Sequence, residues 1–526
     1  MEKERKELHL IKEGEKTGII PMLLSRYGLV VLLFLAEIAL MVFLFIKIDN
    51  LKILVVLQAI FFLVALTFLV NHPTMGPEGK MTWLLLIVAI PVGGLLFFLF
   101  TQTNVGYLSN IKNMNEIIRK TKDNNPQNPE TYEKLRKDDK EIAGMVNYLN
   151  KANSHPVYDN STVEYFPLGE YKLEALLDEL EKAEKYIYFE YFIINEGRAW
   201  GQILDVLARK AKEGLDVRVI YDATVELSAL PHDYTERLAS IGIKAKSFSP
   251  FTLYLSTNYN YRNHRKIVVI DGHTGFTGGI NLADEYMNMK VKYGHWKDTA
   301  VMVKGEACKT LKQLFIQDWN LDEKVHQFKE LEEVDEYPKY KNSRKGYIVP
   351  FGDQPFDQYN LGERVYIDIL NRADKYCYIM TPYLVYDREL EQALKYAAQR
   401  GVDVELILPG IPDKKFMYAI ARANYNQLLR AGVKIYEYTP GFVHAKMFVS
   451  DHEESVVGTI NLDYRSLYHH FECGLYMYKS PAVKKVYEDF LETREKCREV
   501  TVESNKKNNM LYVAIGSVLK FIGPLL

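Results

Sequence analysis

The chain has 526 residues, of which 48% are hydrophobic and 13% aromatic, so it is not a disordered protein and is long enough for two or three domains. The formal net charge of −2 gives no general attraction to nucleic acid, and we expect no nucleic-acid partner. The four cysteines are scattered without a C-x-x-C pair, which argues against a disulfide framework or a zinc knuckle.

Three apolar runs come first, over residues 29–46, 53–70 and 83–100. A helix of about eighteen residues measures roughly 27 Å, which approaches the ~30 Å hydrocarbon core of a bilayer. We therefore expect residues 1–105 to form a membrane region with three transmembrane helices. Three crossings would put the N-terminus and the rest of the chain on opposite faces, and the flanking basic residues do not indicate which face is cytoplasmic.

Residues 106–155 are charged and contain asparagines and prolines, which favours a solvated linker with room for one helix. The last segment, residues 501–526, is apolar but is interrupted by Lys520, so we expect an interfacial or docking helix there rather than a span. Between these segments lie residues 156–335 and 336–500, which repeat one pattern.

The repeated pattern alternates helices with short apolar strands. "YIYFEYFIIN" at 186–195 and "LDVRVIYD" at 215–222 are typical of strands, and "GQILDVLARKAKEG" between them is typical of a helix. The same order recurs in the second segment, where "CYIMTPYLV" at 377–385 corresponds to the first strand. Strands that alternate with helices indicate a mostly parallel sheet covered on both faces. We therefore predict an α/β protein with two such lobes related by a pseudo-twofold axis.

Each lobe also carries one copy of a polar motif, "NHRKIVVIDGHTGFTGGINLADEY" from residue 263 and "VHAKMFVSDHEESVVGTINLDY" from residue 443. Both copies hold a histidine, a lysine, an aspartate and an asparagine at the same spacings, with glycine before the asparagine. The members are His264, Lys266, Asp271, Gly279 and Asn281 in the first copy, and His444, Lys446, Asp451, Gly458 and Asn461 in the second. A single motif of this kind is commonly a surface pair, but two copies with identical spacings indicate one shared site.

If the lobes face each other, two imidazoles, two ammonium groups and two amides converge and suit a tetrahedral oxyanion such as a phosphodiester. One imidazole can act as nucleophile and the other as general acid and then base. The lysines supply the positive charge, so we expect no metal and no cofactor. The nearest metal-binding alternative uses His264, Asp271 and His273, and the adjacent lysine disfavours it. Asp271 and Asp451 belong to this catalytic set, and we expect them to brace the motif rather than to react.

The two histidines need acceptors that orient their second ring nitrogen. Asp298 follows His264 by 34 residues, and Glu472 follows His444 by 28 residues. We expect these two carboxylates to orient the histidines. The alternative is that either carboxylate belongs to a surface ion pair.

Both motif copies match the H-x-K-x4-D-x6-G-[GST]-x-N signature of the phospholipase D superfamily. Together with the N-terminal apolar runs, "GHWKDTAVMVKG", "FIQDWN", "MTPYLV" and "VGTINLDYRSL" resemble segments of bacterial cardiolipin synthases of the phospholipase D type. The resemblance extends from about residue 50 to the C-terminus. The chain departs from that family in its additional first apolar run and in "YDATVEL", which replaces a glycine-rich turn, and neither departure touches the catalytic set.

The resemblance implies transfer of a phosphatidyl group from one phosphatidylglycerol to another, which gives cardiolipin and glycerol through a phosphatidyl-histidine. It implies His264 as the nucleophile and His444 as the acid and base, and the pseudo-symmetry leaves the reverse assignment open. The side chains and glycines that would hold the phosphate are Lys266, Lys446, Asn281, Asn461, Gly279 and Gly458.

The same resemblance implies a multi-pass protein of the cell membrane whose catalytic lobes are cytoplasmic. Phosphatidylglycerol and cardiolipin would be its partners, and a homo-oligomer remains open. Three alternatives remain: hydrolysis by a phospholipase D-type phosphodiesterase, transfer to another alcohol, and a catalytically silent membrane scaffold. The two intact motifs disfavour the scaffold, and the small net charge disfavours a nuclease.

Overall fold

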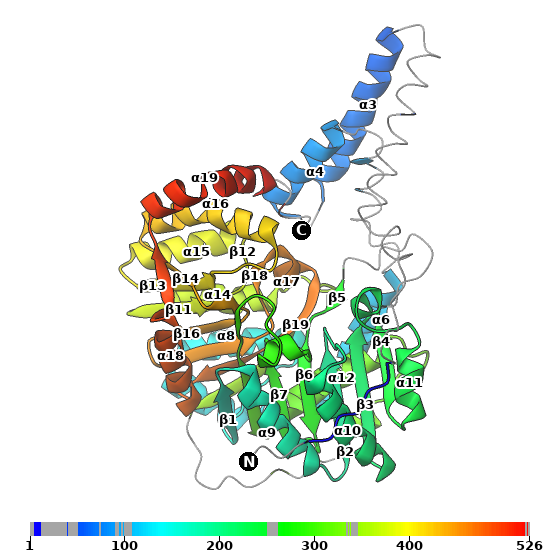
Figure 1. Ribbon diagram of the computed structural model, residues 1–526. Coiled ribbons are helices and arrows are strands. Elements are labelled where there is room, and N and C mark those ends of the chain that lie inside the picture. Colours follow the sequence, from blue (N-terminus) through cyan, green and yellow to red (C-terminus); the bar gives the residue numbers. More distant parts are fainter. Residues whose placement is uncertain are drawn as a thin grey trace.

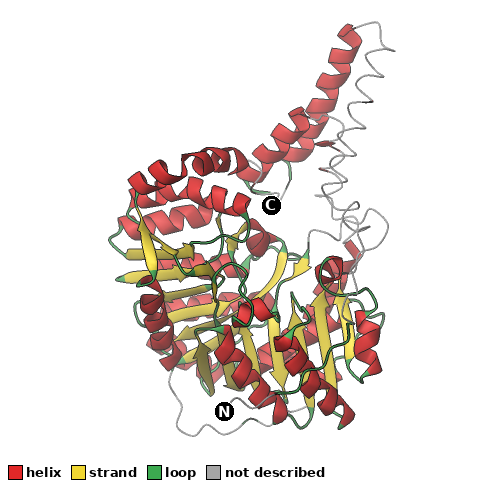
Figure 2. Ribbon diagram, in the orientation of Figure 1, coloured by secondary structure: helices red, strands yellow, loops and turns green. Residues whose placement is uncertain are grey.

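The computed structural model describes residues 5–11, 39, 51–72, 75–89, 94–95, 98, 108–249, 261–332, 335, 337, 346–520 and 523. Two lobes form the body of the molecule, and each is built on one β-sheet with helices packed against it (Figure 1, Figure 2). Helices α3 (Leu51–Val70) and α4 (Pro77–Ala89) project from this body (Figure 1).

The first lobe contains a seven-stranded sheet in the order β1-β9-β7-β6-β2-β3-β4. Alternate residues of its central strand β2 point to opposite faces, as pleating requires. Ile187 and Phe189 enter the core under α9 and α10, whereas Tyr186 and Tyr188 enter the core under α12. The strands and helices are β1 (Ser161–Phe166), α9 (Gly169–Glu181), β2 (Tyr186–Tyr191), α10 (Arg198–Lys212), β3 (Asp216–Asp222), α11 (Tyr234–Ser240), β4 (Lys244–Phe248), β6 (Lys266–Ile270), β7 (Thr274–Gly278), β9 (Ala300–Gly305) and α12 (Cys308–Asn320).

The second lobe repeats this plan with a nine-stranded sheet, of which eight strands run in the order β10-β19-β17-β16-β11-β13-β14-β20. Its helices α14, α15 and α16 cover one face, and α18 covers the other. The elements are β10 (Tyr347–Asp353), α14 (Leu361–Arg372), β11 (Tyr376–Met380), α15 (Arg388–Gln399), β13 (Asp403–Pro409), α16 (Lys415–Ala431), β14 (Lys434–Tyr438), β16 (Met447–Ser450), β17 (Glu454–Gly458), β19 (His470–Tyr478), α18 (Pro481–Arg494) and β20 (Cys497–Val500).

The two lobes share a hydrophobic core rather than merely touching. Val301 and Val303 of the first sheet pack in the same buried cluster as Val449 and Val457 of the second. All four side chains are fully buried. The lobes are therefore fixed relative to each other at the level of their sheets, which a site built from both of them requires.

The prediction of mostly parallel sheets is wrong, because both sheets are mixed. In the first lobe only the pairs β2–β3 and β3–β4 are parallel, and the other neighbours run antiparallel. The motif strand β6 is joined to β7 by the short turn at Asp271, Gly272 and His273, so the chain reverses at once and must pair antiparallel. The alternation of helices and strands predicted parallel pairing correctly only for the part of each lobe that precedes the motif.

Residues 106–155 do not form the solvated linker that their composition predicted. They contain the helices α6 (Leu108–Thr121), α7 (Pro129–Asp138) and α8 (Lys140–Asn153). Ile117 of α6 is buried in a core of the first lobe, and Val146 and Leu149 of α8 are buried in the core of the second. The segment is charged on one side only, and its apolar side helps to hold the lobes together.

Residues 5–11 lie against the first lobe. The backbone N of Leu8 donates to the carbonyl O of Gly201 at 3.0 Å, and those of Leu10 and Ile11 donate to the carboxylate of Glu196 at 2.9 and 3.0 Å. The N-terminal segment is thus on the same side as the lobes, and the predicted placement on opposite faces is wrong.

The predicted span over residues 29–46 lies outside the described residues, apart from residue 39. The run over 53–70 falls within α3, and the run over 83–100 falls partly within α4. Among the helices that the structure describes, none is both long and apolar enough to cross a membrane. The transmembrane helices stay a prediction.

The C-terminal segment forms α19 (Val502–Leu519), which docks along α16 (Figure 1). Asn505 anchors its start, because its amide donates to the carbonyl O of Arg422 at 3.0 Å. The side of α19 that faces away from α16 exposes Met510, Leu511 and Val518. This agrees with the prediction of a docking helix, and its outer side remains apolar.

Candidate active site

Two short strand pairs cross between the lobes and define the site. β5 (Arg262–Asn263) pairs in parallel with β19, which places Asn263 opposite Phe471. β8 (His295–Lys297) pairs in parallel with β15 (Gly441–Val443), which places Lys297 opposite Val443. The residues that follow each pair are therefore neighbours, and they are four of the predicted site residues: His264 with Glu472, and His444 with Asp298.

His264 contacts a carboxylate of the opposite lobe. Its Nδ1 atom lies 2.9 Å from both Oε1 and Oε2 of Glu472, and its backbone N donates to the carbonyl O of Phe471 at 2.9 Å. Glu472 is fully buried and also accepts hydrogen bonds from the hydroxyl of Ser466, at 2.7 Å, and from that of Thr459. Because Glu472 occupies Nδ1, the Nε2 atom of His264 is the one available for chemistry.

The second histidine repeats this arrangement with the lobes exchanged. The Nδ1 atom of His444 lies 2.6 Å from Oδ2 of Asp298, and its backbone N donates to the carbonyl O of Lys297 at 2.7 Å. The other oxygen of Asp298 accepts from the backbone N of Thr299 at 2.8 Å. Asp298 and Glu472 thus contact the histidines as predicted, but each carboxylate serves the histidine of the other lobe.

Both motif lysines are buried beside their histidines. Nζ of Lys266 donates to the carbonyl O of His264 at 2.7 Å, and Nζ of Lys446 lies 2.8 Å from Nδ1 of His444. Burial lowers the pKa of Lys266 to about 8 and that of Lys446 to about 7, and the charges of Glu472 and Asp298 oppose this shift. The ammonium groups are therefore partly desolvated and available to an anionic ligand.

The same environment keeps both imidazoles neutral. Burial, followed by the charges of Lys266 and Lys446, lowers the pKa of His264 and that of His444 well below their usual value. Burial raises the pKa of Asp298 to about 6, against the lowering effect of Lys446. A neutral imidazole with Nδ1 bound to a carboxylate presents a lone pair at Nε2, which suits a nucleophile or a base.

The two motif asparagines differ in how far their amides are already hydrogen-bonded. The amide of Asn281 accepts from the backbone N of Ile193 at 3.1 Å and donates to the hydroxyl of Tyr286 at 3.0 Å. The buried amide oxygen of Asn461 has no hydrogen-bond partner among the described residues, so this amide is less committed than that of Asn281. Phosphate binding by either amide stays a prediction.

The motif glycines are required by close packing. A Cβ atom on Gly279 would lie 2.1 Å from Oδ1 of Asp298, and one on Gly458 would lie 2.5 Å from the carbonyl O of Cys473. Any side chain at Gly279 would therefore displace the carboxylate that contacts His444. These contacts explain the two glycines without a phosphate, whose contact with them stays a prediction.

Asp271 and Asp451 lie at the far end of the motif strands from the histidines. The carboxylate of Asp271 accepts from the backbone N of Glu184, Lys185 and Tyr186 at 2.8, 2.8 and 2.9 Å. Asp451 accepts from the equivalent backbone groups, those of Asp374, Lys375 and Tyr376, at 2.7, 2.9 and 2.9 Å. Both aspartates fix the start of the neighbouring strand, which agrees with the bracing interpretation, and a catalytic role for either of them stays a prediction.

Aromatic rings that the sequence analysis did not select flank both histidines. The ring of Phe192 meets that of His264 edge-on at 5.0 Å, and the ring of Tyr286 meets that of His444 edge-on at 5.3 Å. Phe192 follows the aromatic strand β2 directly, and Tyr286 comes five residues after Asn281. Tyr286 lies within the quoted motif segment, which was a signal that could have found it, whereas Phe192 lies 72 residues before His264 and carried no such signal.

Arg265, the residue between His264 and Lys266, links the lobes beside the site. Its Nη1 donates to Oδ2 of Asp318 in the first lobe at 2.7 Å. Its Nε and Nη2 donate to the carbonyl O atoms of Glu472 and Asp353 in the second lobe at 3.0 and 3.1 Å. The equivalent position of the second motif is Ala445, so this link has no counterpart.

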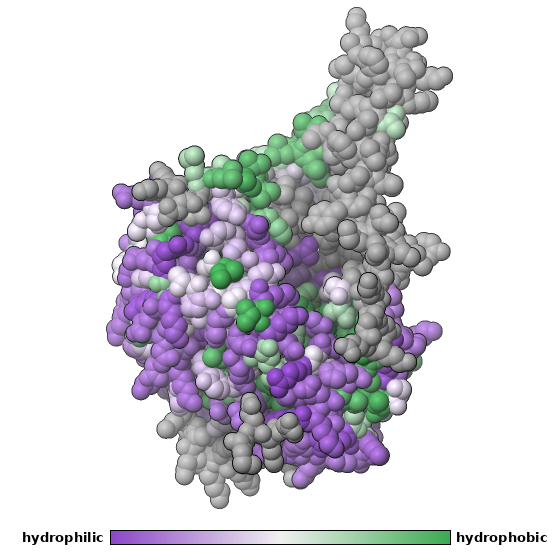
Figure 3. Space-filling model, viewed as in Figure 1, coloured by the Kyte–Doolittle hydropathy of each residue, from purple (hydrophilic) through white to green (hydrophobic). Residues whose placement is uncertain are grey.

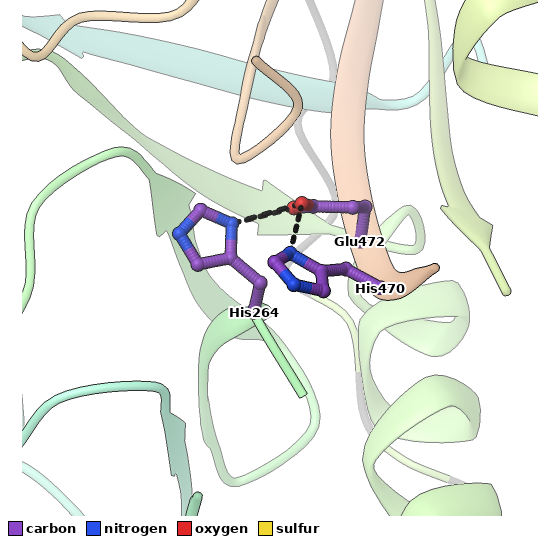
Figure 4. A group of neighbouring side chains, drawn as sticks. All are labelled: His264, His470 and Glu472. Carbon is purple, nitrogen blue, oxygen red and sulfur yellow. Dashed lines mark hydrogen bonds and ion pairs between the residues drawn. The ribbon is translucent and has the colours of Figure 1, made fainter. Parts of the chain in front are cut away.

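The metal-binding alternative built on His264, Asp271 and His273 is not assembled, since the strand β6 separates His264 from the other two. Among the described residues, one group could hold a metal ion, and it consists of His264, His470 and Glu472. Figure 4 shows a ring nitrogen of each histidine directed at the carboxylate. His470 was not selected from the sequence, because a lone histidine outside the motif carried no signal.

The family described as "Cardiolipin synthase, PLD-like domain" matches residues 176–319 and 366–494, which together make up about half of the chain and contain both histidines and both carboxylates. The chain belongs to this family. The two matched ranges fall within the two lobes, one range in each.

Relatives of the family are similar to this chain over most of its length. A cardiolipin synthase of Alkalihalophilus pseudofirmus is 33% identical over 484 residues, which cover 91% of this chain and 94% of that protein. A cardiolipin synthase of Clostridium perfringens is 33% identical over 86% of this chain and 95% of its own length. An uncharacterized protein of Streptococcus mutans serotype c is 47% identical over 87% of this chain and 99% of its own length.

Among solved structures, a phosphatidylserine synthase of Haemophilus influenzae is similar in fold, with a TM-score of 0.55 over 73% of this chain and 98% of that chain. Its sequence identity of 17% limits this similarity to the fold. The family match therefore shows a phospholipase D-like architecture, and the similarity in fold to the phosphatidylserine synthase agrees with its two lobes.

Proposed function

We propose that this protein is a phosphatidyltransferase that joins two phosphatidylglycerol molecules into cardiolipin and releases glycerol. The observation that carries the proposal is the crossed pairing of His264 with Glu472 and of His444 with Asp298, beside two buried lysines. Two neutral imidazoles, each fixed by a carboxylate, supply a nucleophile and an acid–base group for a phosphodiester. The lysines supply the charge that stabilises the phosphorane-like transition state.

In the first half of the reaction, Nε2 of His264 attacks the phosphorus of one phosphatidylglycerol. The bond from phosphorus to the headgroup oxygen breaks, and His444 gives its proton to the leaving glycerol. The approaching phosphodiester anion offsets the lysine charges that lower the pKa of His444, so substrate binding itself favours the protonated form of His444. The product of this half is a phosphatidyl group on His264.

In the second half, His444 takes the proton of the terminal hydroxyl of a second phosphatidylglycerol. The oxygen of that hydroxyl attacks phosphorus, the bond from phosphorus to Nε2 breaks, and cardiolipin leaves. Ping-pong chemistry of this kind lets one anionic pocket serve both halves, because the same lysines face the same phosphoryl oxygens each time.

We further propose that the lobes work at the cytoplasmic surface of the cell membrane, to which the N-terminal region anchors them. Apolar side chains support this proposal, because α19 exposes Met510 and Leu511 and α4 exposes Met81 and Val88. Figure 3 shows that the hydrophobic surface of α19 continues toward α4. A lipid substrate that stays in its bilayer reaches the site only if the site lies at that surface.

The test uses purified protein in liposomes of phosphatidylglycerol labelled in the glycerol headgroup, and it measures cardiolipin, free glycerol and phosphatidic acid together. We expect cardiolipin and glycerol in equal amounts, and neither product with His264→Ala. His273→Ala is the matched control, since this histidine of the same lobe lies at the far end of β6 and should leave the products unchanged.

Other outcomes distinguish the alternatives. Phosphatidic acid and glycerol without cardiolipin would mean that water is the acceptor and that the protein is a phosphodiesterase. If no cardiolipin forms but a new phosphatidyl ester appears when another alcohol is supplied, the protein is a transferase with a different acceptor. No product from any of these lipids would leave only the silent scaffold.

A further inference from the structure

We propose that a zinc ion binds His264, His470 and Glu472 and thereby inhibits the protein. The inhibitory part rests on the proposed function, because it assumes that His264 is the nucleophile. The binding part does not, since it depends only on three side chains. The two parts therefore have separate tests.

The three side chains already lie at distances that suit a zinc ion. Nδ1 of His264 lies 2.9 Å from both oxygens of Glu472, and Nδ1 of His470 lies 3.5 Å from Oε1 of the same carboxylate. The ligand atoms of the three residues all lie within 4.8 Å of one another. Ligands bonded to a tetrahedral zinc ion at about 2.0–2.1 Å stand roughly 3.3–3.5 Å apart, so only small rotations are needed.

His470 has a nitrogen that this ion would satisfy. Its side chain is 10% exposed, and Nδ1 makes no hydrogen bond within the described part of the chain, although it is directed at Glu472 (Figure 4). A buried ring nitrogen without a hydrogen bond costs free energy, and a metal ion removes that cost. Two imidazoles with one carboxylate are also the ligands of many open zinc sites, whereas magnesium and calcium prefer oxygen ligands.

Zinc at this position would disable the nucleophile through its tautomer. Without metal, the proton on Nδ1 of His264 is donated to Glu472, and Nε2 carries the lone pair. A zinc ion on Nδ1 displaces that proton, and the ring stays neutral by taking one proton up at Nε2. Nε2 then has no lone pair with which to attack phosphorus, and Glu472 is held by the metal.

The positive charge of Lys266 limits how tightly zinc binds at this site. Lys266 is hydrogen-bonded to the carbonyl O of His264, and its charge opposes a second cation nearby. We therefore expect binding weaker than in a structural zinc site, which makes the inhibition reversible by a chelator. An inhibitory site of this strength responds to changes in free zinc rather than remaining permanently filled.

The binding test titrates zinc into the purified protein in detergent free of anionic lipid, in competition with a chromogenic chelator. We expect one ion per chain, and His470→Asn should weaken its binding by more than about tenfold, because loss of a group that only supports a metal ligand already costs about 10–100-fold. His469→Asn is the matched control, because its ring lies toward Tyr261, 6.3 Å away, rather than toward Glu472. Equal zinc affinity of the two variants would overturn the site.

X-ray absorption at the zinc edge of the unmodified protein provides a second measurement, which does not depend on how a variant folds. Two imidazole ligands are expected, and fewer than two would also overturn the site. The activity test measures cardiolipin formation against free zinc, with each variant compared with its own zinc-free rate. We expect inhibition that EDTA reverses, that magnesium does not cause, and whose midpoint shifts with His470→Asn by the same factor as binding.

Binding without inhibition would overturn the inhibitory part alone. Specific binding by a protein that makes no cardiolipin under any condition would instead count against the proposed function and leave the zinc site standing. The two failures are therefore distinguishable.

Discussion

The Nδ1 atom of His264 lies 2.9 Å from the carboxylate of Glu472, although the two residues belong to different lobes. The reciprocal contact joins His444 to Asp298 at 2.6 Å. Each lobe thus supplies one histidine and the carboxylate that orients the other histidine. Neither His264 nor His444 takes its carboxylate from its own lobe, so the duplication is a requirement of the site and not only a feature of the fold.

The crossed pairing predicts how the two carboxylates act. Glu472→Gln and Asp298→Asn should each lower kcat by about 10²–10⁴, because an amide no longer stabilises the required tautomer or the positive charge that develops on the ring. KM for phosphatidylglycerol should change much less, since each carboxylate contacts Nδ1 of a histidine, on the side of the ring away from the reacting Nε2. Steady-state cardiolipin formation in mixed micelles measures both constants.

Chemical modification tests which histidine each carboxylate serves. Glu472→Gln should change the rate at which diethyl pyrocarbonate modifies His264, mapped by mass spectrometry, and leave His444 as it was. Asp298→Asn should do the reverse. If each carboxylate instead affected the histidine of its own lobe, the crossed arrangement would be refuted.

The pKa values predict a narrow pH optimum. The pKa of Lys446 is about 7 and that of Lys266 about 8, so kcat/KM should fall as the pH rises through these values and the ammonium groups lose their protons. It should also fall as the pH drops through about 6, where Asp298 becomes protonated and stops assisting His444. A pH profile of kcat/KM measures both limbs.

A guanidinium stays protonated at all accessible pH values, and this provides the control for the alkaline limb. Lys446→Arg should move that limb to higher pH, even where the larger side chain lowers the absolute rate. An alkaline limb that keeps its position in Lys446→Arg would contradict its assignment to this lysine.

Asp271 and Asp451 should matter for stability rather than for chemistry. Asp271→Ala leaves three backbone N–H groups without their acceptor and should cost about 3 kcal/mol of unfolding free energy. Asp451→Ala removes the same contacts in a more exposed place and should cost less. Thermal unfolding measures the cost. A loss of kcat in Asp271→Ala as complete as that in His264→Ala, with unchanged thermal stability, would restore the catalytic role.

Arg265 should stabilise the contact between the lobes. Arg265→Ala leaves the buried carboxylate of Asp318 with the amide of Asn263 but without its cationic partner, and it should cost about 3–5 kcal/mol. Arg209→Ala breaks an exposed pair with Glu181 and should cost at most about 1 kcal/mol, which makes it a matched control. Equal shifts of the unfolding temperature in the two variants would show that Arg265 does not hold the lobes together.

The site residues were predictable from the sequence because they follow a repeated spacing, and the lobes were predictable because the spacing recurs 180 residues later, from His264 to His444. The crossing of the pairs was not predictable. It depends on β5 and β8, strands of two and three residues that pair with a distant strand and leave no periodic signal.

Two errors have a common physical origin. The linker interpretation of residues 106–155 gave more weight to the number of charges than to their placement, although Ile117, Val146 and Leu149 lie on the apolar faces of amphipathic helices. The parallel-sheet prediction gave more weight to helix–strand alternation than to the short turn after β6. In the first case the placement of the apolar residues decided the structure rather than the number of charges. In the second case the short turn decided it rather than the alternation of elements.

The most direct test of the account is to look for the phosphatidyl-histidine itself. Protein mixed with phosphatidylglycerol carrying a labelled phosphate is quenched in alkali within one turnover, digested and analysed by mass spectrometry. The account predicts a labelled phosphatidyl group on His264, lost on addition of unlabelled phosphatidylglycerol as cardiolipin appears. A label on His444 alone, or cardiolipin formed with no labelled histidine at any time, would contradict it.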